Sequence, residues 1–285
     1  MQIKELIAIG EEILEKARIA DYKIDAEALL SYEIGYSKQK IFMNWIHEVS
    51  FERCESYFDI VNLRASGYPL QYITGEQQFM EHTFFVDENV LIPRPETEEL
   101  VQHAIDMITA NKKIKNVLDM CTGSGVIAVS LAAKFPGVKV TGADISEAAL
   151  DVACRNADSI CKGNNILFEQ SDLFESIKLG RLVKKYDLII SNPPYIKKSV
   201  LPTLQREVYN HEPLLALDGG VDGLDFYRKI ISDAIPYFSK NGCLLLEIGH
   251  DQAEDVHLML EKESYKDVEI IKDLSGRDRI VKAFR

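Results

Sequence analysis

The first 70 residues place apolar side chains at helical spacing and show no strand-like alternation. Asp25 and Gly35 are expected to begin and end one helix, and Ser50 and Gly67 another. A helix before them is indicated by apolar positions that recur about every three or four residues, namely Ile3, Leu6, Ile7, Ile13, Leu14 and Ala17. The pattern predicts a small helical domain over residues 1–70.

The pattern changes over residues 71–93, where β-branched and aromatic residues are interrupted by glycine and polar turns. This composition predicts a β-hairpin that links two domains. A helix is then expected to begin at Pro95, because proline suits a first helical turn. Glu96, Glu98 and Glu99 would lie in that turn, where the helix dipole favours negative charge. The second domain is therefore expected over residues 94–285.

Short apolar strands and amphipathic helices alternate through most of this second domain. Repeated β-α-β units imply a largely parallel sheet with helices on both faces, and so an α/β fold. A helix over 146–160 would be capped by Ser146. The other expected elements are strands over 116–120, 138–144, 165–170, 186–191 and 242–249, a helix over 125–135 and a terminal hairpin over 269–284.

Four polar residues are expected at or just after the carboxyl ends of these strands: Asp119, Asp144, Asp172 and Asn192. Open α/β sheets bind their ligands beyond the carboxyl ends of the strands. The strand pattern therefore brings these side chains to the place where the fold expects chemistry.

Composition and charge narrow the classes of partner. Lys and Arg number 33 against 45 Asp and Glu, a formal charge of −12. Tight binding to bare duplex nucleic acid needs cationic side chains for the phosphates, so direct, sequence-specific nucleic-acid binding is not expected. The five cysteines show no C-x-x-C spacing, which argues against a zinc site, and no other metal is expected. The N-terminus does not resemble a signal peptide and no apolar run is long enough for a membrane span, so a cytoplasmic location without membrane contact is expected.

A glycine loop lies between the first strand and first helix of the alternating region. Gly123 and Gly125 would permit a tight turn and the close approach of a ligand to the helix N-terminus. Asp144, at the end of the next strand, is placed to accept hydrogen bonds from a ribose. The loop also satisfies G-x-G-x-x-A, so a dinucleotide is a rival to other adenosine-bearing ligands.

Asp119 favours one of these ligands. It lies at the end of the strand that enters the loop, where a carboxylate would repel a pyrophosphate. The same carboxylate suits the amine-bearing, cationic methionine part of S-adenosylmethionine. The alternative is that Asp119 only caps the backbone of the loop, as aspartate often does in turns.

The strand over 186–191 stops at the sequence Asn192-Pro193-Pro194-Tyr195. Two prolines hold their backbone carbonyls rigidly and remove two backbone donors. Together with the side-chain carbonyl of Asn192, they could accept hydrogen bonds from a planar NH₂ group, against whose face Tyr195 could pack. The motif thus favours a clamp for an amide or an exocyclic amine, with a merely rigid turn as the alternative.

These motifs occur together with three longer stretches, "RASGYPLQYITGEQQFMEHTFFVDENVLIPRPETEELV", "NHEPLLALDGGVDGLDFYRKI" and "LLLEIGHDQ", which extend from Arg64 to Gln252. The combination resembles the release factor glutamine N5-methyltransferases, the PrmC or HemK family. The resemblance implies a Rossmann-like class I methyltransferase fold with a mostly parallel seven-stranded sheet. It also implies a helical N-terminal domain that recognises peptide chain release factors, whose Gly-Gly-Gln glutamine is the acceptor. S-adenosylmethionine would be the methyl donor and S-adenosylhomocysteine the product.

The resemblance assigns roles to individual residues of this chain. Asn192, Pro193 and Tyr195 would be catalytic, and the substrate would contact Asn192, Pro193, Pro194, Tyr195, Arg94 and Glu96. The cofactor would contact Asp119, Cys121, Thr122, Gly123, Ser124, Gly125, Asp144, Ile145, Asp172, Leu173 and Asn192. Cys121 departs from the glycine expected at the first small position of the loop. A thiol is expected to fit there, with cofactor affinity preserved, if the residue keeps a negative φ.

Two rival functions use parts of the same pattern. An adenine-N6 nucleic-acid methyltransferase would need the same NH₂ clamp, but the charge of −12 and the lack of a basic recognition domain argue against it. A nicotinamide-dependent oxidoreductase or a non-catalytic cofactor-binding module would use the glycine loop alone, and would leave Asn192 to Tyr195 unexplained.

Overall fold

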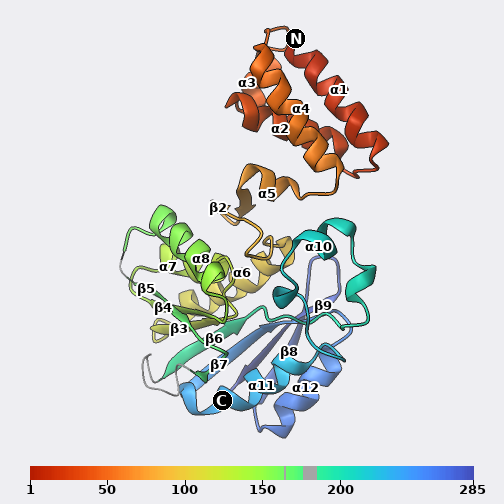
Figure 1. The fold of residues 1–285 in the computed structure, drawn as a ribbon. Coiled ribbons are helices and arrows are strands. Elements are labelled where there is room, and N and C mark those ends of the chain that lie inside the picture. Colours follow the sequence, from red (N-terminus) through yellow and green to blue (C-terminus); the bar gives the residue numbers. More distant parts are fainter. Residues whose placement is uncertain (164, 176–184) are drawn as a thin grey trace. The chain divides into compact units, whose positions relative to one another are not determined.

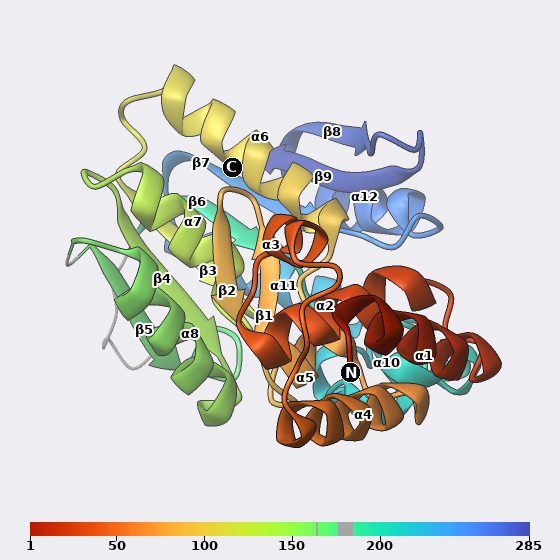
Figure 2. The ribbon, with the colours of Figure 1, turned by 90° about the horizontal axis from the view of Figure 1, so that it is seen from above.

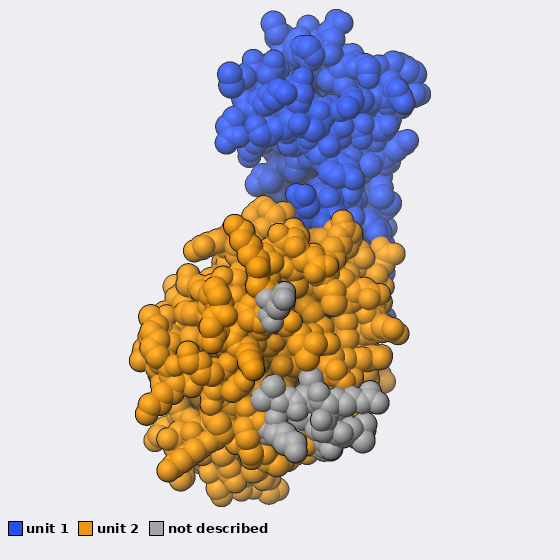
Figure 3. Space-filling model, turned by 90° about the vertical axis from the view of Figure 1, so that its left-hand side faces the viewer, with its two compact units in different colours: residues 1–76, 205–211 blue, residues 77–204, 212–285 orange. Residues whose placement is uncertain are grey.

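The computed structural model describes residues 1–163, 165–175 and 185–285, and the chain divides into two compact units (Figure 3). Unit 1 comprises residues 1–76 and 205–211, and unit 2 comprises residues 77–204 and 212–285. Unit 1 is thus assembled from two separate stretches of chain, the second of which interrupts unit 2.

Unit 1 is helical, as the spacing of apolar residues predicted. Its core includes the fully buried side chains of Leu6, Leu29 and Tyr57, from three different helices. The helices, which carry labels in Figure 1, are α1 (Ile3–Lys16), α2 (Tyr22–Ile34), α3 (Lys38–Met43), α4 (Phe51–Ala65), α5 (Leu70–Thr74) and α10 (Arg206–His211).

The predicted start of the second helix at Asp25 is wrong. Helix α2 begins at Tyr22, and Asp25 lies inside it with 5% of its surface exposed. The guanidinium of Arg64 explains how a buried carboxylate is tolerated there, because Arg64 Nε lies 2.7 Å from Asp25 Oδ2. Asp25 therefore belongs to a buried ion pair and does not cap the helix.

Three other helix signals are confirmed. Gly35 ends α2 in the left-handed conformation, with φ of 67°. The hydroxyl of Ser50 accepts a hydrogen bond from the Arg53 amide at the start of α4. Ser146 likewise accepts from the Ala149 amide and caps α8 (Glu147–Ile160).

A two-stranded hairpin follows the helices of unit 1, with strands β1 (Glu76–Phe79) and β2 (His82–Phe85). Residues 71–74, expected in the hairpin, lie instead in the short helix α5. Pro69 precedes this helix and Gly75 ends it at φ of 71°, so the two residues bound a single helical turn.

Unit 2 contains the predicted seven-stranded sheet, in the order β5-β4-β3-β6-β7-β9-β8. The first five strands in this order are parallel, and β9 runs antiparallel to both of its neighbours. Figure 2 shows β5 and the β8–β9 hairpin on opposite sides of the sheet. The strands are β3 (Asn116–Met120), β4 (Lys139–Asp144), β5 (Ile166–Gln170), β6 (Tyr186–Ser191), β7 (Phe238–Glu247), β8 (Lys266–Lys272) and β9 (Asp278–Phe284).

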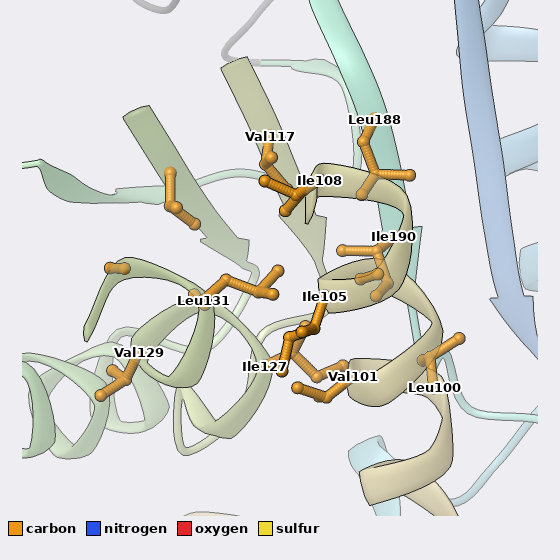
Figure 4. Close-up of a cluster of buried hydrophobic side chains, with 14 of the residues drawn as sticks. Leu100, Val101, Ile105, Ile108, Val117, Ile127, Val129, Leu131, Leu188 and Ile190 are labelled. Atoms are coloured by element: carbon orange, nitrogen blue, oxygen red, sulfur yellow. The ribbon is translucent and has the colours of Figure 1, made fainter. Parts of the chain in front are cut away.

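Helices cover both faces of the sheet (Figure 1). One face packs against α6 (Pro95–Ala110), α7 (Val126–Lys134) and α8, through apolar side chains such as Ile105, Ile127 and Ile190 (Figure 4). The other face packs against α11 (Asp225–Asp233) and α12 (Ala253–Lys262). Short 3₁₀ turns occur at η1 (Leu201–Thr203), η2 (Leu214–Ala216) and η3 (Ile235–Tyr237). This two-sided core fixes the strand ends that carry the site.

Candidate active site

The carboxyl ends of β3 to β6 border a cavity of about 310 Å³ in unit 2. The strand-end position is the one at which sheets of this kind bind ligands. Several residues that the sequence singled out line the cavity: Cys121, Gly123, Asp144, Ile145, Asp172, Leu173, Asn192 and Pro194.

The other residues singled out do not line this cavity. Five of them lie directly beside lining residues in the chain: Asp119, Thr122, Ser124, Pro193 and Tyr195. Gly125 lies two residues after the lining residue Gly123. Arg94 and Glu96, from the start of α6 and the residue before it, also lie outside the lining.

Asp119 makes the contacts of a residue that caps the loop. It is completely buried, and its Oδ2 accepts hydrogen bonds from the Thr122 hydroxyl at 2.5 Å and from the Ala128 amide at 3.1 Å. Among the described residues, its Oδ1 has no hydrogen-bond partner. Burial raises the pKa of this carboxyl to about 7, against which the bonds from Thr122 and Ala128 act. Asp119 thus holds the loop onto the first turn of α7.

Asp144 holds the other side of the loop and faces the cavity. Its Oδ2 accepts from the Gly123 amide and its Oδ1 from the Ser146 amide, both at 2.9 Å. Burial raises the pKa of Asp144, while these backbone hydrogen bonds oppose the shift. The carboxylate therefore joins the glycine loop to the start of α8, and each oxygen keeps a further lone pair for a ligand.

Gly125 needs to be glycine for two reasons. Its φ is 80°, and a Cβ atom there would lie 3.0 Å from the Cβ of Ala153 on α8. The neighbouring Ser124 carbonyl accepts from the buried amide of Asn156, which also bonds both backbone groups of Phe85 in β2. The glycine loop is thus packed against α8 and tied through Asn156 to the hairpin.

Cys121 does not keep the negative φ on which its fit was expected to depend. Its φ is 60°, in the left-handed region where a non-glycine residue costs about 1–2 kcal/mol. The side chain nevertheless packs against the buried cluster beside α11, which offsets part of that cost. Burial raises the pKa of the Cys121 thiol well above its ordinary value, so it stays protonated and poorly nucleophilic.

Asn192 follows the last residue of β6 and is oriented by Thr97 of α6. The amide Nδ2 donates to the Thr97 hydroxyl at 3.0 Å, and that hydroxyl donates to Glu247 Oε2 at 2.7 Å. Glu247 ends β7 and is only 1% exposed, so its carboxylate is buried beside Thr97. Nothing in the sequence singles out Thr97, although its neighbour Glu96 was expected to contact the substrate.

The backbone of the proline motif is anchored from a different direction. The Tyr195 carbonyl accepts from Gln252 Nε2 at 3.0 Å, and the same amide nitrogen donates to the Gly223 carbonyl. Burial raises the pKa of the Tyr195 hydroxyl, so the ring keeps its proton. Gln252 belongs to the stretch "LLLEIGHDQ", to which no role had been assigned.

Arg94 pairs with a residue that adjoins the cavity lining. Its Nη2 lies 2.5 Å from Oε1 of the buried Glu212, and the next residue, Pro213, lines the cavity. Leu215 and Phe226 also line it, from stretches that the sequence showed but to which no role was given. Such apolar wall residues carry no chemical signature, and only the fold brings them to the cavity.

The residues present fit an adenosylated, cationic methyl donor. Gly123 lines the cavity, and a Cβ atom there would meet no heavy atom within 4 Å. The carboxylates of Asp144 and Asp172 supply negative charge at the same cavity, while side chains such as Leu173 and Leu215 supply apolar surface. A sheet of this order, with a glycine loop after its first parallel strand, defines a class I methyltransferase.

Comparison with known proteins gives the family. Residues 5–75 match the PrmC N-terminal domain, and residues 98–215 match the methyltransferase small domain. A release factor glutamine methyltransferase of Clostridium acetobutylicum is 38% identical over 100% of this chain and 99% of its own length. That of Bacillus subtilis is 39% identical over 90% of this chain and 89% of its own. The chain belongs to the release factor glutamine methyltransferase family.

Solved structures support the fold alone. The hMettl16 catalytic domain, solved in complex with the MAT2A 3′UTR hairpin 6, superimposes with a TM-score of 0.57 over 79% of this chain and 81% of that one, at 16% identity. Within the described residues, no helix has the length and apolar character that a membrane crossing requires.

Proposed function

We propose that the protein transfers a methyl group from S-adenosylmethionine to the side-chain nitrogen of the glutamine in the Gly-Gly-Gln motif of peptide chain release factors. The observation that carries the proposal is the orientation of Asn192 beside the cavity: its NH₂ group is engaged by Thr97, which leaves its carbonyl oxygen to accept from a substrate amide. The membership of the family supports the choice of release factors as substrates.

The roles of the residues follow from their positions. Asp144 and Asp172 would hold the ribose and adenine side of the cofactor, and the backbone of Gly123 would border it. When bound, S-adenosylmethionine supplies a methyl group on a sulfonium and leaves as S-adenosylhomocysteine, while the glutamine nitrogen exchanges one proton for that methyl group. The substrate nitrogen becomes more positive as it attacks, so the carbonyls of Asn192 and Pro193 would stabilise it most in the transition state.

Recognition of the release factor is assigned to the helical domain together with Arg94, Glu96 and Tyr195. The five cysteines of the chain are free thiols, which suits the reducing cytoplasm in which this substrate would be met. A nucleic-acid adenine would use the same NH₂ acceptors, but the formal charge of −12 opposes a nucleic-acid substrate.

The test is transfer of label from S-adenosylmethionine to a purified release factor or to DNA, followed by mapping of the labelled position. Label on the Gly-Gly-Gln glutamine is expected, and label on DNA adenine alone would refute the proposal. Asn192→Ala is expected to lower kcat by at least about a hundredfold, because it removes an acceptor aimed at developing charge. Its cofactor affinity, measured by calorimetry, should stay nearly unchanged, and an equal loss of both would contradict the clamp.

A further inference from the structure

Thr97 forms a buried link between three elements of unit 2. The side chain lies on the first turn of α6 with 3% of its surface exposed. Its hydroxyl donates to the carboxylate of Glu247 at the end of β7, at 2.7 Å, and accepts from Asn192 after β6, at 3.0 Å. The single hydrogen of the Thr97 hydroxyl is therefore already engaged with Glu247, and the hydroxyl cannot donate to Asn192 as well.

The order of these hydrogen bonds follows from the chemistry of the groups. An ionised carboxylate can only accept hydrogen bonds, so Glu247 accepts the one hydrogen bond that the Thr97 hydroxyl can donate. Thr97 can then only accept from Asn192, and the amide must turn its NH₂ group toward it. The carbonyl oxygen of Asn192 is left facing away, which is the orientation that accepts an N–H bond from a substrate.

We propose that Thr97 and Glu247 are positioning residues that fix the direction of the Asn192 amide, and thereby select a substrate that offers N–H donors over one that offers acceptors. The inference rests on the proposed function for the identity of the substrate amide. Without the link, either end of the Asn192 amide could face the substrate, and the reversed amide would present its NH₂ group to the substrate nitrogen.

Glu247 also lies close to other ionisable groups. Besides accepting a hydrogen bond from Thr97, its carboxylate interacts electrostatically with the phenol of Tyr195. The charged groups that face it are Arg279 from β9 and Glu96 from α6, and its backbone carbonyl accepts from the buried Tyr227 hydroxyl of α11. The Thr97 hydroxyl is therefore the group through which this carboxylate orients the Asn192 amide.

Protonation of Glu247 would release the link. Burial raises the pKa of this carboxyl to about 7, with the hydrogen bond from Thr97 acting against the shift. The protonated acid can donate to Thr97, whose hydroxyl is then free to donate to the carbonyl of Asn192 and favours the reversed amide. The fraction of correctly oriented enzyme, and with it kcat, should fall as the pH drops through about 7.

The experiment compares Thr97→Val with Thr97→Ser and with Thr109→Val, each assayed on a release factor. Valine keeps the shape and removes the hydroxyl, serine keeps the hydroxyl, and Thr109 is an exposed residue of the same helix. We expect Thr97→Val to lose about ten- to a hundredfold in kcat with little change in cofactor Kd, and to lose the acidic limb of its pH profile near pH 7. Thr97→Ser should recover most of kcat, and Thr109→Val should match the wild type.

A second measurement tests selectivity and separates the two proposals. A release factor with Glu in place of the Gly-Gly-Gln glutamine should inhibit Thr97→Val more strongly than the wild type, because a freed amide can turn its donors toward a carboxylate. Wild-type kcat in Thr97→Val, or an acidic limb unchanged by the substitution, would overturn the inference even if the wild type methylates glutamine. If the wild type does not methylate glutamine, the proposed function fails. The NMR signal of the Asn192 side-chain NH₂ group still tests the link to Thr97. Its chemical shift should change in Thr97→Val and remain the same in Thr97→Ser.

Discussion

The buried carboxyl of Asp119 makes the stability of the protein depend on pH in a way that one substitution should reveal. Its pKa is raised from an ordinary 3.8 to about 7, chiefly because the side chain is completely buried. Between these two values the folded protein holds a proton that the unfolded chain releases. Raising the pH through this window therefore lowers the free energy of unfolding.

The size of the effect follows from the pKa difference. A shift from 3.8 to about 7 corresponds to about 4 kcal/mol in total, at about 1.4 kcal/mol for each pH unit. About 2 kcal/mol of this loss falls between pH 5 and pH 7, because the group is already half ionised in the folded protein at pH 7. Asp119→Asn cannot titrate, so its free energy of unfolding should decline less over the same range by about that amount.

The measurement is urea unfolding of wild type and Asp119→Asn at several pH values from 5 to 8. Glu247 and Asp144 also have raised pKa values and remain in both proteins, so only the difference between the two pH slopes reports on Asp119. Asp151→Asn, at an exposed position of α8, controls for a change of net charge. Parallel pH profiles for wild type and Asp119→Asn would show that the carboxyl is already ionised in the folded loop.

Two further substitutions test the loop and the helical unit. Gly125→Ala should cost about 1–3 kcal/mol of stability and weaken cofactor binding, because its Cβ would lie 3.0 Å from that of Ala153 at φ of 80°. Gly137→Ala is the control, since a Cβ atom there would meet no heavy atom within 4 Å. Thermal unfolding and calorimetry should show a loss for Gly125→Ala and no change for Gly137→Ala. Arg64→Met should cost about 3–5 kcal/mol in urea unfolding by leaving Asp25 buried without its partner. Adding Asp25→Leu should restore most of that loss, and a double variant no more stable than Arg64→Met would argue against the ion pair.

Much of the fold could be predicted because its signals are local. The alternation of apolar strands and amphipathic helices gave the parallel part of the sheet, and residues such as Gly35 and Ser146 marked helix ends through their own backbone chemistry. The start of α2 was wrongly predicted at Asp25, because the sequence around this aspartate resembles that of a helix N-cap. Its true partner, Arg64, lies 39 residues away in the chain, and no local pattern shows such a pair.

The candidate site was predictable to the extent that its residues carry distinctive chemistry at strand ends. Asp144 and Asn192 could be placed at the cavity from the strand pattern alone. Thr97 could not, because a threonine in a first helical turn is ordinary until β6 and β7 bring Asn192 and Glu247 to it. The positive φ of Cys121 was also hidden, since the sequence shows which residue is present but not the backbone that the loop requires.

The divided sequence of unit 1 has a consequence for how the protein can be taken apart. Residues 205–211 belong to this unit, and Glu207 among them accepts from Arg64 Nη2 at 2.8 Å. A cut after residue 76 would therefore leave one helix of the helical unit behind in the remaining chain, with its ion pair broken. The chain passes between the units three times, so the helical unit is built from two stretches of chain and cannot be exchanged as a simple N-terminal module.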